Sequence, residues 1–192
     1  MGEVCGLVLA AGAGRRFGGP KAVVELDGER LVDRAVRVLD EGGISQVYVV
    51  SGSVALSVPG AVVVGNPDWA SGMASSLLAG LDGLPPTTEA AMVVLVDHVG
   101  LTAEAVRRVA AEARGPASLV AATYDGLQGH PVVIGRDWWS EVRATAAGDQ
   151  GAREVLAAHR DVLVQVECSD VASGADVDRP ADLATYRDGR RG

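Results

Sequence analysis

Apolar residues along the chain fall into short continuous runs, and the segments between them repeat apolar residues at helical spacing. A short apolar run is typical of a strand buried on both faces of a sheet. Such runs lie at residues 4–10, 46–50, 61–64, 92–96 and 162–166, with helical patterns at residues 31–39, 71–81, 102–113 and 152–159 and a last helix after Pro180. Strands that alternate with helices of this length predict βαβ units and a mostly parallel sheet.

Two further strands, at residues 119–123 and 131–134, are joined by a segment that contains Asp125-Gly126. This turn predicts an antiparallel pair inserted into the parallel pattern. We therefore predict an α/β fold that is Rossmann-like and doubly wound, with a mostly parallel sheet and a small antiparallel insertion. Because no repeat or linker divides the chain, residues 1–188 are expected to form a single domain, followed by a frayed tail at residues 189–192.

Composition and charge exclude several classes of protein. The chain has 192 residues and a net charge of −8, and it lacks the run of about 18 apolar residues that a membrane-spanning helix needs. The acidic balance argues against nucleic acid, whose binding depends on neutralised phosphates. Cys5 and Cys168 are too few for a secreted disulfide framework or a metal site of their own, and no basic leader precedes the first strand. We expect a cytoplasmic protein that binds neither nucleic acid nor a membrane.

A loop rich in glycine and basic residues follows the first strand, within residues 9–21. In open α/β sheets, ligands bind beyond the carboxyl ends of the strands, where this loop lies. Glycines let backbone N–H groups surround phosphate oxygens, and Arg15, Arg16 and Lys21 add positive charge. An acidic chain that gathers three cations in one glycine loop is expected to bind an anion there.

Two familiar phosphate-binding motifs do not fit this loop. A P-loop requires Gly-Lys-Ser/Thr, but Lys21 lies between Pro20 and Ala22. The dinucleotide fingerprint is G-x-G-x-x-G, whereas the glycines here are spaced G-x-G-x-x-x-G, and no acidic residue ends the second strand. The plainer alternative is a glycine-rich turn with solvated arginines.

The loop resembles the signature of a known family. Residues 9–21 match the pattern L-A-A-G-x-G-x-R-x-G-x-x-K at every fixed position, which is similar to the MobA-like NTP transferases and closest to the molybdenum cofactor cytidylyltransferases. Further segments that resemble this family lie at residues 66–77, 129–131, 148–153 and 176–183. The resemblance covers essentially the whole chain. It implies a GT-A-like nucleotidyltransferase fold and the transfer of a nucleoside monophosphate from an NTP to a phosphate-bearing acceptor, with release of pyrophosphate.

The resemblance also implies roles for individual residues. Arg16 and Lys21 occupy the positions that contact the NTP phosphates and are expected to act in catalysis. The implied nucleotide-binding residues are Leu9, Ala10, Ala11, Gly12, Gly14 and Arg15 in the loop, and Asn66, Ser75 and Ser76 in the base-binding segment. The form of the loop and the Gly72-Met73 segment resemble the cytidylyl branch, which favours CTP over GTP. A plainer interpretation of residues 71–73 is a helix N-cap and first turn, which is compatible with base binding.

Two aspartates are the candidate ligands of Mg²⁺, the expected cofactor. Asp97 follows an apolar strand, where a carboxylate is costly to desolvate without a cation, and the resemblance places the family's metal-binding Asp there. A second family Asp corresponds to Asp178, with Asp176 two residues earlier on the face of an expected strand. Asp178 would also suit the start of a helix at Pro180. Arg179 replaces the family's usual Thr and is expected either to weaken metal binding or to contact a phosphate.

His98 and His130 are the candidate acceptor-binding residues. The family usually follows the strand-end Asp with Gln-Pro or Thr-Pro, whereas this chain has His-Val-Gly at residues 98–100. His98 is therefore an altered acceptor contact, an additional ligand or an ordinary polar neighbour of Asp97. Trp138 and Trp139 follow the expected acceptor insertion, and we expect them to pack in the core rather than to stack on a pterin.

Three functions remain open at this point. The first is a Mg²⁺-dependent cytidylyltransferase that uses CTP and acts on molybdopterin, with a transient contact to a molybdoenzyme as an added expectation. The second is a nucleotidyltransferase for a sugar phosphate or another small phosphate. The third is a non-catalytic accessory protein that binds nucleotide or cofactor while a molybdoenzyme matures. A Rossmann oxidoreductase ranks last, because the dinucleotide fingerprint is absent.

Overall fold

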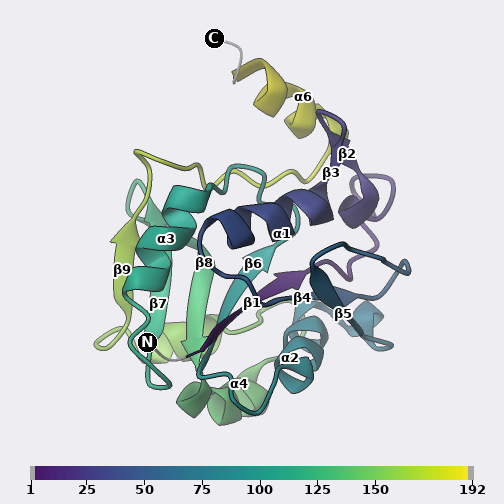
Figure 1. Cartoon of the computed structure of the whole chain (residues 1–192). Coiled ribbons are helices and arrows are strands. Elements are labelled where there is room, and N and C mark those ends of the chain that lie inside the picture. Colours follow the sequence, from purple (N-terminus) through teal and green to yellow (C-terminus); the bar gives the residue numbers. More distant parts are fainter. Residues whose placement is uncertain (1–2, 190–192) are drawn as a thin grey trace.

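The computed structural model describes residues 3–189 and contains a seven-stranded sheet (Figure 1). Each predicted apolar run forms a strand, because side chains of its type are stable only when both faces of the sheet are covered. The strands are β1 (Val4–Leu9), β4 (Val47–Ser51), β5 (Ala61–Gly65), β6 (Ala90–Leu95), β7 (Leu119–Tyr124), β8 (Leu127–Gly135) and β9 (Val164–Glu167), in the spatial order β5-β4-β1-β6-β8-β7-β9. The predicted α/β, mostly parallel architecture is confirmed.

Only β8 runs against the other strands of this sheet. It pairs antiparallel with both β6 and β7, whereas the remaining neighbours pair in parallel. The expected antiparallel insertion is therefore a strand inside the main sheet rather than an addition beside it. Since β8 reverses direction, its first residues lie beside the carboxyl end of β6, with Val132 opposite Val93. This reversal brings Gln128 and His130 to the edge of the sheet where the glycine loop lies.

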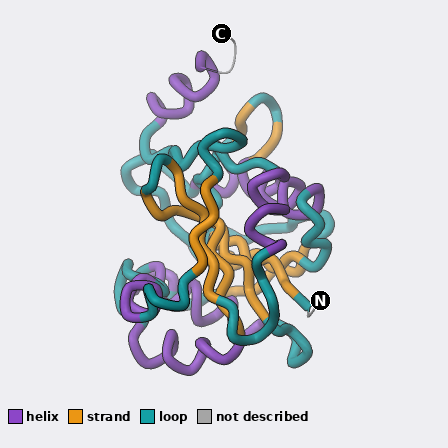
Figure 2. The backbone as a smooth tube through the Cα atoms, turned by 90° about the vertical axis from the view of Figure 1, so that its left-hand side faces the viewer, coloured by secondary structure: helices purple, strands orange, loops and turns teal. Residues whose placement is uncertain are grey.

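Helices cover both faces of the sheet, which is the doubly wound arrangement (Figure 2). On one face lie α1 (Leu31–Glu41) and α3 (Ala103–Ala111), whose apolar sides join the core at residues such as Leu39 and Val106. On the other face lie α2 (Met73–Gly83), α4 (Trp139–Thr145) and α5 (Arg153–Ala158), which pack through Leu77 and Trp139. Thr102 caps α3 as its position predicts, because its side chain accepts a hydrogen bond from the N–H of Ala105 at 3.3 Å.

A two-stranded antiparallel sheet and the last helix lie apart from these layers at the top of Figure 1. The small sheet pairs β2 (Glu25–Leu26) with β3 (Glu29–Arg30), and the Asp27-Gly28 turn between them is the signal that the sequence contained for it. The last helix is α6 (Pro180–Gly189), and its Leu183 packs with Leu26 in a third apolar cluster. The expected domain end at residue 188 falls inside α6, and residues 190–192 of the expected frayed tail lie outside the described residues.

Three local expectations differ from the structure. The strand expected at residues 162–166 forms at Val164–Glu167, and α4 was not expected, because it is seven residues long and has no side-chain cap. The segment around Asp176 and Asp178, expected to be a strand, is an irregular connection that pairs with no sheet. Among the described residues, no helix is long and apolar enough to cross a membrane.

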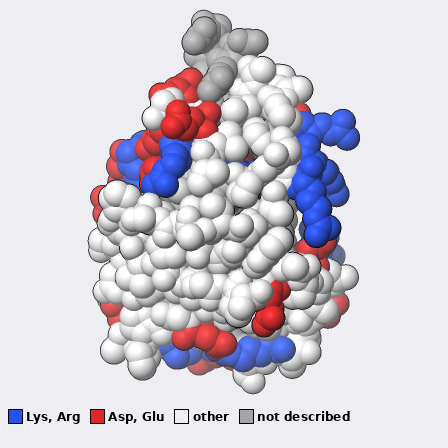
Figure 3. Space-filling model, turned by 90° about the vertical axis from the view of Figure 1, so that its right-hand side faces the viewer, with Lys and Arg blue, Asp and Glu red and all other residues white. Residues whose placement is uncertain are grey.

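The surface is unevenly charged. On the side shown in Figure 3, charged side chains lie round the margin and the middle of the face is uncharged. That side is the right-hand side of Figure 1, next to β5, whose Val62 is exposed. The basic residues of an acidic chain are thus distributed locally, so net charge alone does not describe its binding sites.

The carboxylate of Glu167 holds the turn between β7 and β8. It accepts hydrogen bonds from the Ser169 hydroxyl, from Thr123 Oγ1 at 2.8 Å and from the backbone N–H groups of Asp125 and Gly126 at 3.2 and 3.4 Å. These bonds, led by those from Ser169 and Thr123, lower the pKa of Glu167 to about 2. The carboxylate thereby ties β9 to the turn that precedes Gln128 and His130.

We expect Glu167→Gln to lower the melting temperature at neutral pH. The pKa of this carboxyl falls from 4.5 to about 2 on folding, so its stabilising effect is present above about pH 4.5 and is lost as the pH falls toward 2. Melting curves of wild type and variant, followed by circular dichroism, should differ above pH 4.5 and converge near pH 2. A difference that does not change with pH would contradict this role.

Candidate active site

The glycine loop after β1 is folded around the carbonyl of Gly14. This oxygen accepts hydrogen bonds from the N–H groups of Phe17, Gly18 and Gly19, at 2.9, 2.9 and 3.2 Å. Gly14 has a φ of +59°, and a Cβ at this position would lie 1.9 Å from the carbonyl oxygen of Gly19, so only glycine fits here. Within the described part of the chain, the backbone N–H groups of residues 12–16 donate no hydrogen bond. Consecutive unpaired N–H groups of this kind form an anion-binding cradle.

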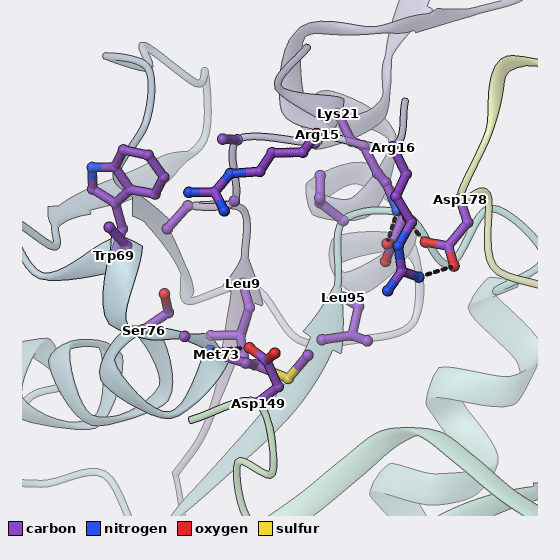
Figure 4. Close-up of a pocket in the computed structure, with 18 residues that line it drawn as sticks. Leu9, Arg15, Arg16, Lys21, Trp69, Met73, Ser76, Leu95, Asp149 and Asp178 are labelled. Atoms are coloured by element: carbon purple, nitrogen blue, oxygen red, sulfur yellow. Dashed lines mark hydrogen bonds and ion pairs between the residues drawn. The ribbon is translucent and has the colours of Figure 1, made fainter. Parts of the chain in front are cut away.

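Lys21 joins the two candidate metal ligands. Its Nζ donates to Asp97 Oδ2 at 2.7 Å and to Asp178 Oδ1 at 2.8 Å, and Arg16 Nη1 lies 3.4 Å from Asp178 Oδ2 (Figure 4). Burial lowers the pKa of Lys21, but the hydrogen bonds to Asp178 and Asp97 outweigh it and raise the pKa above its usual value. The same hydrogen bond from Lys21 lowers the pKa of Asp178. All four groups are therefore charged at neutral pH.

Backbone contacts between distant segments bring these side chains together. Asp97 follows β6 at the carboxyl edge of the sheet, where the N–H of Val96 donates to the carbonyl of Leu9 at 3.2 Å. The N–H of Val177 donates to the carbonyl of Asp97 at 3.0 Å, which sets Asp178 beside the ammonium group. Lys21 begins a short 3₁₀ turn, Lys21–Val23, and it is the only lysine in the chain. All other basic side chains except the histidines are arginines, so the compact ammonium is a specific feature of this site.

The donor set fits a divalent cation that also binds substrate. Asp97 and Asp178 both reach one positively charged atom, the Nζ of Lys21, so their oxygens converge on a single cation. Among the described residues, no group of three or more His, Cys, Asp and Glu side chains could hold a metal ion. The chain thus offers two carboxylates, and the other ligands would come from a nucleotide or water, as is usual for Mg²⁺.

The loop and the carboxylates line a cavity of about 420 Å³. Six of the residues expected to bind the nucleotide line it, namely Leu9, Ala11, Gly12, Gly14, Arg15 and Ser76, as do Arg16, Lys21, Asp97 and Asp178. Ala10 faces the opposite layer and packs in the core. Asn66 and Ser75 lie behind the wall, where Asn66 Nδ2 donates to the hydroxyls of Ser75 and Ser76 at 2.9 and 3.1 Å. The structure therefore separates Ala10, Asn66 and Ser75 from the cavity.

A second cavity of about 370 Å³ adjoins the first and is lined by His98 and His130. Leu9, Met73, Leu95 and Asp149 line both cavities. Burial, together with the charges of His98 and Arg153, lowers the pKa of His130 to about 4. The imidazole of His130 is therefore neutral at physiological pH and suited to hydrogen bonding rather than to holding an anion by charge.

Trp69, Met73 and Asp149 line the cavities although they were not among the expected site residues. Asp149 Oδ1 accepts a hydrogen bond from the N–H of Met73 at 3.3 Å, and the carbonyl of Gly148 accepts one from Ala74 at 2.8 Å. The Gly148–Arg153 segment thus covers the first turn of α2 between the two cavities. Its resemblance to a family motif was the available signal, but spacing alone gave no contact between residues 73 and 149.

Comparison with known proteins agrees with this geometry. Residues 6–162 match the family described as the MobA-like NTP transferase domain. The chain belongs to the MobA-like NTP transferase family. The assignment covers the glycine loop, both cavity-lining helices and Asp97, and it confirms the resemblance seen in the sequence.

Individual relatives of this MobA-like protein have different names. It is 39% identical over 190 residues to nicotine blue oxidoreductase from Paenarthrobacter nicotinovorans, with 91% of this chain and 92% of the relative covered. A crystal structure of the Rv0371c homologue from Mycobacterium sp. strain JC1 matches with a TM-score of 0.82 at 26% identity, over 97% and 96% of the two chains. Rv0371c from Mycobacterium tuberculosis in complex with manganese matches with a TM-score of 0.67 at 23% identity, over 99% and 97%.

Two residues that depart from the family's usual pattern lie differently in the MobA-like site. His98 is buried in the wall of the second cavity, where Nε2 lies 2.8 Å from the carbonyl oxygen of Ser173 and the ring packs edge-on against Tyr124. Its Nδ1 has no partner among the described residues. Arg179 is exposed, and its backbone N–H donates to Asp182 Oδ2 at 2.7 Å. His98 can therefore reach the acceptor side only through the ring surface that faces the cavity.

We expect Gly14→Ala to weaken nucleotide binding at least about tenfold, because the added methyl group would displace Gly19 and open the cradle. Isothermal titration with CTP and Mg²⁺ measures the effect. Gly19→Ala is the matched control, since its Cβ would meet nothing within 4 Å and its φ is not positive. Equal affinities of Gly14→Ala and wild type would show that the loop does not form the nucleotide cradle.

Proposed function

We propose that this chain transfers CMP from CTP to a phosphate-bearing acceptor, with a divalent metal ion as cofactor and the molybdopterin cofactor as the acceptor. The supporting observation is that two cavities meet at Leu9, Met73, Leu95 and Asp149. One cavity contains the phosphate cradle and the carboxylates, and the other contains His98 and His130. A nucleotide and an acceptor could thus bind at the same time, with their reacting groups at the shared wall.

The proposed reaction forms one phosphorus–oxygen bond and breaks another. An oxygen of the acceptor phosphate attacks the α-phosphorus of the nucleotide, and pyrophosphate leaves with the electrons of the bond that breaks. The acceptor phosphate is already an anion, so no side chain needs to act as the nucleophile. Catalysis then depends on orienting the two phosphates and on stabilising the negative charge that moves to the leaving group.

Residues of the first cavity provide the charges for this reaction. Lys21 and Arg16 contact the triphosphate, and the unpaired N–H groups of residues 12–16 bind its oxygens. Asp97 and Asp178 would hold Mg²⁺ or Mn²⁺, which supplies Lewis-acid stabilisation of the phosphates when it is bound. The manganese complex of a protein with the same fold supports a divalent ion at such a site.

The acceptor cavity supports a flat ring system rather than a strongly charged molecule. Apolar residues line much of it, and its polar groups include neutral His130, Gln128 and one arginine, Arg153. Carboxylates at Asp149 and Asp176 offset that arginine. These features are compatible with a pterin whose phosphate extends toward the first cavity, and they make a small sugar phosphate the weaker alternative.

A redox reaction is the second candidate function. It is favoured by the 39% identity, over 91% of this chain, to a protein named nicotine blue oxidoreductase. This identity raises the oxidoreductase above the last place that the missing dinucleotide fingerprint suggested. The apolar second cavity would also accept a planar organic dye.

Ligand binding and product formation distinguish the candidates. We would first measure thermal shifts with CTP, GTP, ATP, UTP, NADH and NADPH, with and without Mg²⁺, because a ligand at 100 times its Kd stabilises by about 2.7 kcal/mol. Pyrophosphate release from CTP in the presence of molybdopterin supports the proposed transfer. Binding without turnover supports the accessory protein, and oxidation of a reduced dinucleotide supports the second candidate.

We expect Lys21→Ala and Asp97→Asn each to lower the rate of pyrophosphate release about a hundredfold or more, because each removes a charge at the reacting phosphates. Lys21→Arg should recover part of the loss by restoring the positive charge. Arg114→Ala, which removes an exposed cation elsewhere, is the matched control and should behave as wild type. Wild-type turnover in both Lys21→Ala and Asp97→Asn would refute the assignment.

A further inference from the structure

The three tryptophans of the chain differ in how their indole N–H groups are used. Trp138 Nε1 donates to the carbonyl of Ala117 at 2.9 Å, and Trp139 Nε1 donates to that of Ile134 at 3.0 Å. Both therefore pack as expected. The indole N–H of Trp69 makes no hydrogen bond within the described part of the chain, and its side chain is half-buried in the wall of the first cavity. Tryptophans with one wet edge are typical of binding surfaces.

Trp69 is held in place by the groups that were expected to read the base. Asn66 Oδ1 accepts a hydrogen bond from the N–H of Asp68 at 2.9 Å, and the Ser75 hydroxyl donates to the carbonyl of Asp68 at 3.0 Å. These bonds support the turn Trp69–Ser71. On the other side, a Cβ at Gly52 would lie 2.5 Å from Cβ of Trp69, so the end of β4 closely contacts the indole. The ring is thus positioned by a rigid frame.

Arg15 extends toward Trp69 across the cavity (Figure 4). Its guanidinium forms no hydrogen bond or ion pair with the described residues, unlike that of its neighbour Arg16. The two side chains are not stacked, because the one cation found over a tryptophan ring in the described part of the chain is Arg136 on Trp139, at 4.3 Å. Figure 4 also shows that Lys21, Arg16 and Asp178 lie at the opposite end of the cavity.

We propose that Trp69 is the platform on which the nucleobase stacks, with Arg15 covering the other face of the base. This inference rests on the proposed function, since it assumes that a nucleoside triphosphate occupies the first cavity. The phosphates lie at the Lys21 end, so the base lies at the Trp69 end. Ser76, which lines the cavity, remains available at the edge of the base.

Stacking on an aromatic ring gives affinity without selecting the base, because every nucleobase has a flat π-face. Loss of Trp69 should therefore weaken CTP and GTP by similar factors. It should also weaken CMP as much as CTP, because the base and not the triphosphate contacts the indole. Loss of Lys21 should instead weaken CTP much more than CMP.

Intrinsic fluorescence and calorimetry test this platform in the full chain. CTP with Mg²⁺ should quench the fluorescence of wild type and of Trp138→Phe, the matched control, but not that of Trp69→Phe, which retains an aromatic ring and binds the nucleotide. In Trp69→Ala the Kd for CTP, GTP and CMP should each rise about tenfold or more. Circular dichroism verifies that both variants at position 69 are folded.

Two results would overturn the inference alone. The first is unchanged quenching by CTP in Trp69→Phe, and the second is wild-type affinity for CTP in folded Trp69→Ala. If wild type binds no nucleoside triphosphate, the proposed function fails and the inference fails with it. The calorimetry of wild type therefore separates these two kinds of failure.

Discussion

The ammonium group of Lys21, placed between Asp97 and Asp178, is the contact on which the arrangement of the site depends. It joins the 3₁₀ turn after the glycine loop, the end of β6 and the irregular segment before α6. Without a cation there, two carboxylates would face each other at short range in a partly buried site, which is unfavourable. The same point is therefore both a structural joint and a place prepared for positive charge.

The reversal of β8 gives the fold its second cavity. A parallel strand beside β6 would begin at the opposite edge of the sheet, whereas β8 begins beside the carboxyl end of β6. His130 and Gln128 consequently line a cavity that shares a wall with the nucleotide cavity. The Glu167 carboxylate stabilises the turn that makes this reversal possible.

Family and function are different statements for this chain. The MobA-like fold and the glycine loop determine where an anion binds, but a relative that is 39% identical is named an oxidoreductase. A scaffold of this kind can serve more than one chemistry, because the reaction depends on the groups in the site rather than on the sheet. The second cavity, with a neutral His130 and a buried His98, is where members with different acceptors would differ most.

The sequence alone determined the strands, the main helices and the glycine loop, because burial and backbone conformation impose local patterns that can be read in order along the chain. It also indicated Lys21, Asp97 and Asp178 through motif resemblance, although their roles remain predictions. It did not indicate that Asn66 and Ser75 support a turn behind the cavity wall, that Trp69 faces the cavity, or that Asp149 caps α2. Those features arise from contacts between segments far apart in sequence, and only the tertiary structure decides which side of a wall such a side chain occupies.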